Sequence, residues 1–485
     1  MKILLTGASG AMGSALLQAL QRTNIQVRAF CLPSKKEIRK VKKASPQAEL
    51  FLGDICSYED VYESIEGVDA VVHCSAILPP LADEKPKLCF AVNYGGTKNL
   101  VEALQARQMQ ACKLIFISSV AVYGDRQPPI HWGRVGDPVK SSYYDYYGAS
   151  KIACERLLVE SDLQWLILRQ TGMLSKATLS HRSPLIFHQP LNNVLEYLSD
   201  RDSSRLLIAI LQDPDSSVWR HIYNMGGGQA LRLPSHKLYA RAFGRLGFPD
   251  FTKIMDPSWF ATQNFHGMYF LDSDTLQERY HYVQDGIEYV DHCMKLFVKG
   301  FDGWIRFILR FAPIRRLAEY IARTEMYKLC LKKHGTLHFQ EENGMHKSVF
   351  FKSNKGLPPQ EADHCRKQIL DHGYDESKPK SELTLNDVQK AAIFRGGACL
   401  SQSMQKGDWR SPLEFTCAFG HHFTASPQLI LEAGHFCPHC QKEQWEPSRI
   451  AKNNPFFAQV WWPLHSKEEE SITVEKLVNK ENYKN

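Results

Sequence analysis

The sequence predicts an α/β protein: a doubly wound parallel sheet with a small substrate-binding subdomain, followed by a small C-terminal zinc-binding α+β module. Three observations support this class. Apolar strands alternate with amphipathic helices over residues 1–170, a glycine-rich turn follows the first strand, and cysteine and histidine residues are paired near the C-terminus. Continuous apolar strands alternating with helices are typical of a parallel sheet covered on both faces.

The predicted elements of the first 170 residues follow in chain order. Strand-like runs occupy Lys2–Thr6, Gln26–Cys31, Glu49–Leu52, Ala70–Cys74, Lys113–Ile117 and Trp165–Leu168. Helical patterns occupy Met12–Gln21, Gly95–Arg107 and Tyr146–Val159. Residues 174–298 have a mixed pattern with a turn at Asn224–Gly228, and we expect them to line the substrate pocket.

The length of 485 residues exceeds what one hydrophobic core usually holds, which is about 250–300 residues. The pattern divides the chain into an α/β domain over 1–298 (with 174–298 as its substrate subdomain), a basic amphipathic helical connector over 299–335, a polar linker over 336–380, a zinc-binding module over 381–465 and a charged tail over 466–485. Asn386 is expected to cap the first helix of the module, with Gln389 three residues later.

The formal charge of +7 is concentrated in one segment. Residues 299–335 hold nine basic and three acidic side chains, which leaves the rest of the chain nearly neutral. Nucleic acid is therefore not a predicted partner. Thirteen cysteines are too scattered for a disulfide scaffold, the first residues enter a strand without room for a signal peptide, and no apolar run reaches the roughly 18–20 residues of a membrane span. We expect a cytoplasmic protein.

The glycine-rich turn predicts a dinucleotide site. Gly7-Ala8-Ser9-Gly10-Ala11-Met12-Gly13 stands between the first strand and a helix. Glycines there let a pyrophosphate approach the backbone and bind free N–H groups at the helix N-terminus. The predicted contacts are Gly7, Ser9, Gly10, Ala11, Met12 and Gly13. No acid follows Val27–Leu32 directly to pair with the ribose hydroxyls of NAD, whereas Lys35 and Lys36 suit a 2′-phosphate, so NADP is favoured over NAD.

Several ordered motifs resemble the extended short-chain dehydrogenase/reductase family, also called the epimerase/dehydratase family. They are GASGAMG, Gly53-Asp54-Ile55, His73–Ala76, Asn93–Leu100, SSVAVYG from Ser118 and YGASK from Tyr147. The resemblance covers about residues 1–295. It implies that Asp54 and Ile55 contact the adenine end of the cofactor, that Ala76 and Asn93 lie along its nicotinamide side, and that Ser119 is the catalytic serine.

Tyr147 and Lys151 are four residues apart on a predicted helix and therefore share one face. A lysine ammonium beside a tyrosine lowers the pKa of the phenol from about 10 towards the range of an acid/base catalyst. Neither Tyr143, Tyr144 nor Tyr146 has a lysine four residues on. We expect Tyr147 to transfer the proton, Lys151 to tune it and bind the ribose, and Ser119 to hold the substrate oxygen.

These residues predict an NAD(P)-dependent oxidoreductase acting on a small molecule that carries a secondary alcohol or ketone. Val120-Ala121 stands where sugar-nucleotide dehydratases carry an acidic pair, which argues against dehydration. Two alternatives stay open: a nucleotide-sugar epimerase, and a non-catalytic NAD(P)-sensing scaffold whose zinc module binds a partner.

The metal prediction depends on two pairs, Cys417-x3-His421 and Cys437-x2-Cys440, separated by 15 residues. Thiolates and imidazole at such spacings suit a four-coordinate structural zinc, and the surroundings resemble zinc-ribbon or treble-clef modules. His422, His435 and His439 are alternative ligands. A thioredoxin-like dithiol at Cys437 and Cys440 is the less favoured interpretation, because it leaves Cys417 and His421 unused.

The basic connector has an apolar stripe that includes Phe301 and Trp304 before Pro313 and Ile314 and Leu317 after it. Basic residues opposite aromatic ones are typical of a helix on an anionic membrane, so a peripheral contact through 301–333 is one interpretation. The favoured interpretation is that the stripe packs on the α/β domain or on a second subunit of a homodimer.

Overall fold

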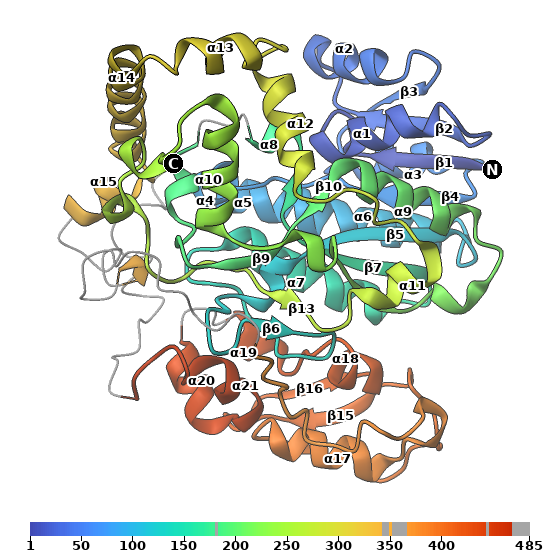
Figure 1. Cartoon of the computed structure of the whole chain (residues 1–485). Coiled ribbons are helices and arrows are strands. Elements are labelled where there is room, and N and C mark those ends of the chain that lie inside the picture. The colour runs from blue at the N-terminus through green and yellow to red at the C-terminus, as the bar shows by residue number, and fades with distance from the viewer. Residues whose placement is uncertain (180–182, 342–348, 352–365, 443–445, 468–485) are drawn as a thin grey trace.

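The computed structural model describes residues 1–179, 183–341, 349–351, 366–442 and 446–467. Its centre is a seven-stranded sheet in the order β11-β7-β5-β4-β1-β2-β3, in which every neighbouring pair is parallel (Figure 1). The strands are β1 (Lys2–Thr6), β2 (Gln26–Cys31), β3 (Glu49–Leu52), β4 (Ala70–His73), β5 (Lys113–Ser119), β7 (Gln164–Gln170) and β11 (Ile222–Met225). The strand order reverses between β1 and β4, and in such sheets ligands bind at the carboxyl ends beside that reversal. The predicted doubly wound fold is confirmed.

Helices cover both faces of the sheet. They are α1 (Ala11–Leu20), α2 (Lys35–Ala44), α3 (Tyr58–Ser64), α4 (Leu81–Glu84), α5 (Pro86–Phe90), α6 (Gly96–Ala106), α7 (Tyr146–Val159), α9 (Asp200–Gln212) and α11 (Asp274–Tyr280). Ile3 and Leu5 of β1 enter the apolar cluster under α1 and α9, whereas Leu4 enters the cluster under α3, α6 and α7. Successive side chains of a strand point to opposite faces, and β1 and β4 are almost entirely buried because both of their faces are covered.

The strand β11 differs from the sequence prediction, which placed a turn at Asn224–Gly228. Ile222–Met225 pairs in parallel with β7, and the turn begins only at Gly226. The segment is short and contains Tyr223 and Asn224, so its sequence lacks the continuous apolar run of the other strands. Its pairing partner, which lies more than 50 residues away, determines its conformation.

The substrate subdomain lies beyond the carboxyl ends of the strands. It contains β6 (Trp132–Gly133), β8 (Met173–Leu174), α8 (Lys176–Leu179), β9 (Val194–Glu196), β10 (Leu198–Ser199), β12 (Arg232–Pro234), α10 (Ser235–Leu246), β13 (Tyr269–Phe270) and α12 (Glu288–Phe297). The connector follows as α13 (Asp302–Ile308) and α14 (Ala312–Cys330), and Pro313 lies in the first turn of α14. In Figure 1, α2 and α13 lie at the same end of the molecule. None of the helices among the described residues combines the length and apolarity needed to cross a bilayer.

The predicted linker over 336–380 is only partly described. Residues Thr336–Glu341 form α15, and residues 342–348 and 352–365 lie outside the described residues. His372 is buried against the α/β domain, where its Nε2 lies 3.0 Å from Oδ1 of Asp137. The predicted charged tail lies outside the described residues from position 468 onward.

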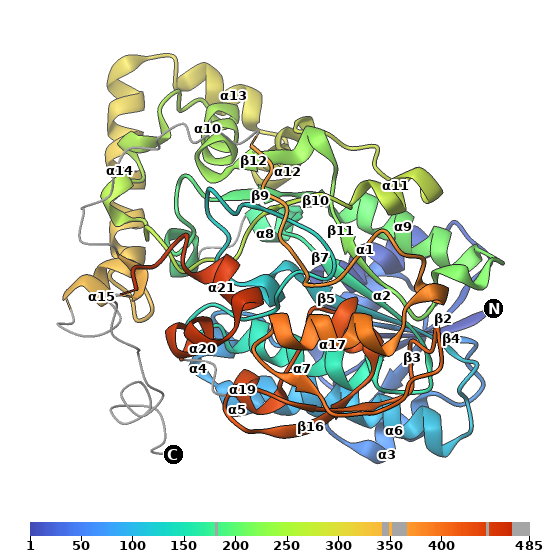
Figure 2. The ribbon, with the colours of Figure 1, turned by 90° about the horizontal axis from the view of Figure 1, so that it is seen from below.

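The C-terminal module packs on the outer side of α7, at the end of the molecule opposite α13 (Figures 1 and 2). Its antiparallel sheet has the order β14-β15-β16. Its elements are α17 (Leu385–Phe394), β14 (Ala398–Cys399), β15 (Leu413–Thr416), β16 (His422–Ala425), α18 (Pro427–Leu431), α19 (Pro438–Lys442), α20 (Pro447–Asn453) and α21 (Pro455–Trp461).

The predicted cap at Asn386 is wrong. The helix α17 begins one residue after Thr384, and the carboxylate of Asp387 accepts a hydrogen bond from the backbone N of Thr384 at 3.0 Å. A capping box of Thr384 and Asp387 therefore starts the helix two residues earlier than Asn386 would, because threonine also serves as an N-cap.

Candidate functional site

The glycine-rich turn after β1 has the geometry of an anion-binding loop. Gly7 has a φ of +68°, and a Cβ atom there would lie 2.7 Å from the backbone N of Ser75. A Cβ atom on Gly13 would lie 2.3 Å from the carbonyl oxygen of Gly7. Both positions therefore require glycine. Gly10 caps α1 without a side-chain hydrogen bond, so the first N–H groups of the helix have no side-chain partner and fit a phosphate.

The predicted adenine-end residues lie just beyond β3. Oδ1 of Asp54 accepts a hydrogen bond from the backbone N of Cys56 at 2.9 Å, which holds the turn. Ile55 is buried, and a Cβ atom on Gly96 at the start of α6 would lie 2.7 Å from its Cγ1 atom. These contacts place Asp54 and Ile55 at the carboxyl edge of the sheet, as a dinucleotide site requires.

Glu37 is a functional candidate that the sequence analysis missed. Its Oε2 atom lies 2.8 Å from the Ser9 hydroxyl of the glycine-rich turn. Burial and the nearby Glu37 carboxylate raise the pKa of the Cys31 thiol, which places Glu37 beside the end of β2. Lys35 and Lys36, the predicted 2′-phosphate contacts, are exposed at the start of α2. The available signal was Ser34-x-x-Glu37, a capping-box pattern in which Ser34 caps α2 and leaves Glu37 facing the loop.

The structure brings the three predicted catalytic side chains together at the end of β5. Ser119 is the last residue of β5, and Tyr147 and Lys151 lie on the first turns of α7. The Ser119 hydroxyl accepts a hydrogen bond from the backbone N of Ala121 at 3.1 Å and is near enough to the Tyr147 phenol to lower the pKa of that phenol. Lys151 is buried, and its Nζ donates to the carbonyl oxygen of Ile117 at 2.6 Å.

The pKa of Tyr147 is raised, because burial outweighs the opposing effect of the Ser119 hydrogen bond. Burial likewise lowers the pKa of Lys151. The Nζ atom of Lys151 is 5.8 Å from the centroid of the Tyr147 ring. The depression of the tyrosine pKa that the spacing predicts is therefore absent from this arrangement, in which the ammonium is hydrogen-bonded to the backbone.

Asn93 connects the loop after β4 to the catalytic helix. Its Oδ1 accepts from the backbone N of Ile77 at 2.7 Å, and its Nδ2 donates to the hydroxyl of Ser150 at 2.8 Å. Asn93 is buried, so both ends of its amide are used by the protein. The same loop contains Ala76, and Asn93 therefore fixes the wall of the crevice on the side where the resemblance places the nicotinamide.

The comparisons agree with this geometry. Residues 3–226 match the model of the NAD dependent epimerase/dehydratase family. The matched residues are a little under half of the chain. The crystal structure of a dTDP-glucose 4,6-dehydratase, DesIV, from Streptomyces venezuelae with NAD and DAU bound is 19 % identical, covers 63 % of this chain and 98 % of its own, and has a TM-score of 0.52. This neighbour supports the fold of an epimerase/dehydratase domain.

Among curated proteins, the epimerase/dehydratase region is similar to dehydrogenases. The human sterol-4-alpha-carboxylate 3-dehydrogenase, decarboxylating, is 33 % identical over 153 residues, which are 32 % of this chain and 38 % of that protein. The 3-beta-hydroxysteroid dehydrogenase of Mycolicibacterium neoaurum is 28 % identical over 203 residues, which are 40 % of this chain and 52 % of that protein. The chain thus matches about two fifths to half of the length of these relatives.

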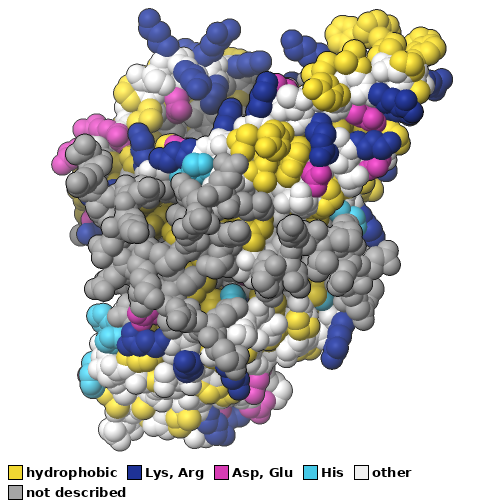
Figure 3. Space-filling view, turned by 90° about the vertical axis from the view of Figure 1, so that its left-hand side faces the viewer, with side chains coloured by type: hydrophobic (Ala, Val, Ile, Leu, Met, Phe, Trp, Pro, Cys, Tyr) yellow, Lys and Arg dark blue, Asp and Glu magenta, His cyan; other side chains and the backbone are white. Residues whose placement is uncertain are grey.

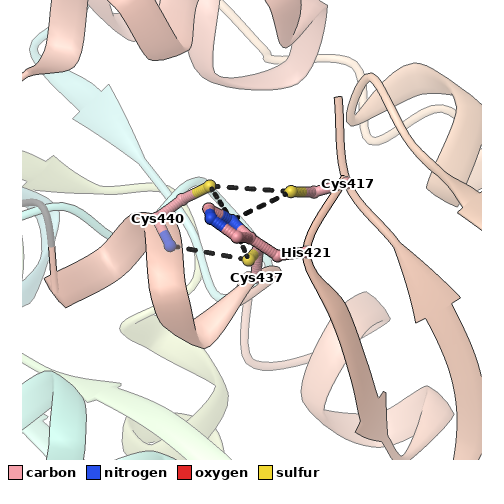
Figure 4. A group of neighbouring side chains, drawn as sticks. All are labelled: Cys417, His421, Cys437 and Cys440. Carbon is pink, nitrogen blue, oxygen red and sulfur yellow. Dashed lines mark hydrogen bonds between the residues drawn. The ribbon is translucent and has the colours of Figure 1, made fainter. Parts of the chain in front are cut away.

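The four predicted metal ligands converge in the C-terminal module (Figure 4). Cys417 and His421 flank the β15–β16 turn, and Cys437 and Cys440 lie at the start of α19. Their ligand atoms all lie within 4.8 Å of one another. The Sγ atoms of Cys417 and Cys440 are 3.8 Å apart, and Nδ1 of His421 is 3.4–3.5 Å from the three sulfur atoms. A tetrahedral zinc with bonds of about 2.0–2.3 Å would need edges of roughly 3.5–3.8 Å, so this donor set fits the ion.

The alternative histidine ligands lie elsewhere. His422 begins β16, and His439 is exposed, with its ring centroid 5.1 Å from that of His421. His435 is fully buried, and its Nε2 lies 3.5 Å from Oε2 of Glu155 in α7. The favoured set is therefore the one that the structure gathers.

The second metal-ligand segment also contacts the catalytic helix. Glu155, one turn beyond Lys151, is fully buried and pairs with Arg169 of β7 at 2.7 Å. The Nη2 atom of Arg169 donates to the carbonyl oxygen of Ala433 at 2.7 Å, and Arg156 donates to that of Phe436. Burial alone would raise the pKa of Glu155, but Arg169 and His435 hold it at about 2. The helix that carries Tyr147 therefore has one of its faces built by the module.

Proposed function

We propose that this protein is an NAD-dependent oxidoreductase that interconverts a secondary alcohol and a ketone. The observation that carries the proposal is the grouping of Ser119, Tyr147 and Lys151 at the carboxyl end of β5, on the edge of the sheet that also holds the glycine-rich turn. A redox sensor without catalysis has no requirement for such a group. This grouping therefore favours the enzyme over the scaffold alternative.

In the proposed mechanism, the protein supplies orientation and proton transfer. NAD, when bound, would supply the hydride acceptor for the alcohol and, as NADH, the hydride donor for the ketone. Ser119 and Tyr147, which lie near each other, bind the substrate oxygen. Tyr147 accepts the hydroxyl proton in the oxidation and donates it in the reduction. Lys151 lies four residues after Tyr147 on α7, and its ammonium would hold the ribose hydroxyls of the cofactor.

The relatives suggest the substrate class. Their names describe oxidation at position 3 of sterols and steroids, so we propose a hydroxyl on an apolar ring system. The epimerase alternative predicts a different outcome, because an epimerase shows no net consumption of NAD.

The catalytic test compares Tyr147→Phe with Tyr62→Phe, a matched change on α3 away from the crevice. Sterol and steroid alcohols are supplied with NAD, and NADH is followed by absorbance. Tyr147→Phe should lower turnover by about 10²–10⁴-fold, the usual contribution of a general acid/base, while NAD binding by calorimetry is retained. Turnover equal to that of Tyr62→Phe would refute the assignment of Tyr147.

We propose NAD as the cofactor in place of the NADP that the sequence favoured, because Glu37 lies beside the loop. A carboxylate there suits ribose hydroxyls and repels a 2′-phosphate. Binding measurements should show tighter binding of NADH than of NADPH. Glu37→Gln should lower the ratio of the NADPH to the NADH dissociation constant by about tenfold, or 1.4 kcal/mol. Lys43→Gln, at the far end of α2, is the control. An unchanged ratio in Glu37→Gln would contradict this role.

We further propose that Cys417, His421, Cys437 and Cys440 bind a structural zinc. The tetrahedral edge lengths support the proposal, and with all four positions filled by protein the ion would have no open site for chemistry. Metal analysis of the purified protein should find one zinc per chain. Retention of that zinc in Cys440→Ser would contradict the ligand set.

A further inference from the structure

The surface of α13 and α14 exposes large apolar side chains. Phe301, Trp304, Phe307, Phe311, Ile314, Leu317, Tyr320 and Ile321 are between 45 % and 69 % exposed. Figure 3, which faces the side that carries α14, shows apolar side chains gathered at the upper end with Lys and Arg around them. Soluble monomers rarely expose contiguous apolar patches of this kind, and such patches mark interaction sites. We call these eight residues the α13–α14 face.

The amphipathic order of these two helices is inverted. On α13, Asp302 is buried and pairs with Arg245, whereas Trp304 is 67 % exposed. On α14, Glu319 is buried, whereas Leu317 and Ile321 on either side of it are exposed. The predicted packing of the stripe on the α/β domain is therefore wrong within the described residues. A helix that turns its acids inward and its aromatic residues outward is adapted to an apolar environment outside the protein.

The face is held firmly by the substrate subdomain. Gly247, which ends α10, packs against Arg306 and Leu309 of α13. Arg323 of α14 pairs with Asp256 at 2.7 Å, and Leu329 and Cys330 enter the apolar cluster that contains Trp259. The exposed apolar residues are thus presented on a fixed scaffold beside the subdomain.

Free positive charge surrounds the apolar residues. Arg306, Arg310 and Arg316 are exposed and have no carboxylate partner among the residues that the structure describes. The helix α2 lies at the same end of the molecule (Figure 1). It adds the exposed basic side chains of Arg39, Lys40, Lys42 and Lys43. Basic side chains near a bilayer surface gain about 1 kcal/mol each from anionic lipids.

We propose that the α13–α14 face docks on an anionic lipid surface, with its aromatic residues in the headgroup region and its arginines on lipid phosphates. This combination of Trp, Phe and Leu with basic neighbours is the pattern of interfacial helices. A second copy of the chain fits less well, because a two-fold interface would place each arginine cluster against its own copy. The proposal is independent of the catalytic one.

The test is co-sedimentation of the full-length protein with vesicles of phosphatidylcholine alone or with about one third phosphatidylserine. The wild type should bind the anionic vesicles more tightly, and high salt should weaken that binding. Trp304→Asp and Leu317→Asp should each lower the partition coefficient about tenfold or more, because each places a charge at the apolar contact. Ile393→Asp is the matched control, since Ile393 is 66 % exposed on α17 in the module at the opposite end of the molecule.

Failure of the wild type to bind anionic vesicles would overturn the proposal, as would equal losses in Ile393→Asp and Trp304→Asp. Sedimentation velocity of the same proteins decides the remaining case. A wild-type dimer that Trp304→Asp dissociates would assign the face to a second copy. Thermal unfolding of each variant near the wild-type midpoint confirms that lost binding does not reflect lost folding.

Discussion

The interface of the C-terminal module and the α13–α14 face differ in which side chains they bury and which they expose. Where the module and the segment before it meet the α/β domain, carboxylates contact basic side chains across the interface: Glu155 contacts His435, Glu376 contacts Arg134, and Glu432 contacts His221. On α13 and α14, the acidic side chains of Asp302 and Glu319 are also buried, but the large apolar side chains of these helices are exposed.

This difference shows where the partner of each surface lies. A buried charge is stable only when it is paired and hydrogen-bonded, so the module has its partner within the chain. The α13–α14 face is apolar and basic, and no described residue covers it. The first surface should therefore respond to mutation through folding, and the second through binding.

Loss of the metal should have the largest effect on the module. Cys437→Ser removes one of four ligands, and structural zinc contributes on the order of 10 kcal/mol to a small domain. We expect loss of zinc by metal analysis and rapid proteolysis of residues 381–465. Turnover should also fall, because the segment around Ala433 and Phe436 supports α7. Cys399→Ser, a buried cysteine of β14 outside the cluster, should keep its zinc, and proteolysis as fast in that control would break the comparison.

Arg169→Met should be the next most damaging change. It leaves the Glu155 carboxylate buried without its main cation, which typically costs about 3–5 kcal/mol. Urea unfolding of Arg169→Met beside Arg39→Met, an exposed arginine of α2, measures the effect. The double variant Glu155→Leu/Arg169→Met should regain part of the loss, because no unpaired charge remains. If Arg169→Met is as stable as Arg39→Met, the Glu155–Arg169 ion pair does not stabilise the contact between α7 and the module.

Acid should loosen the module interface. Burial alone would raise the pKa of Glu376, but His372 and Arg134 hold it at about 2, below the ordinary 4.5. Glu432, which is buried and contacts His221 and Lys380, likewise has a pKa of about 2. A lowered carboxyl pKa contributes stability that is complete above pH 4.5 and is lost as the pH falls towards 2. The free energy of unfolding should therefore decline between pH 4.5 and 2, and it should decline less steeply in Glu376→Gln. If the wild type and Glu376→Gln lose stability equally with falling pH, the ion pair of Glu376 and Arg134 does not have this role.

The smallest effect is expected from truncation of the α13–α14 face. Trp304→Ala should change the free energy of unfolding by no more than about 0.5 kcal/mol, as is usual for exposed sites. Phe415→Ala, at a fully buried position in the module, should cost about 3–5 kcal/mol. Chemical denaturation compares the two directly. A large decrease in the free energy of unfolding of Trp304→Ala would mean that the α13–α14 face packs against protein. The face and the module interface would then not differ in this respect.

Local patterns were sufficient to predict the parallel sheet, and the side chains that they single out as candidate catalytic residues and metal ligands lie close together in the structure. The strands β1, β4 and β5 have central apolar runs, because the sheet buries both of their faces. Tyr147 and Lys151 share a helical face, and Cys437-x2-Cys440 is a spacing that α19 places at its first turn. Each strand, the Tyr147–Lys151 pair and the Cys437–Cys440 pair is determined within a few residues of the chain.

The features that the sequence analysis missed depend on distant contacts. His435 and Glu155 are 280 residues apart, and no local pattern marks Glu155 as an interface residue. Glu37 acts six residues after the end of β2, where an acid beside the ribose is not usually sought. The exposure of Trp304 could not be predicted either, because a helical stripe is the same whether it packs inward or outward.

The apolar core of the module has one more consequence. Leu158 and Trp165 of the α/β domain belong to the same continuous buried cluster as Phe415 and Leu429 of the module. The predicted boundary near residue 381 therefore separates two parts of the sequence that share one hydrophobic core. The α7 side of the sheet and the module should unfold together in one cooperative calorimetric transition. In a fragment that ends before the module, the apolar side chains that the module covers, such as Leu158, would be exposed to solvent.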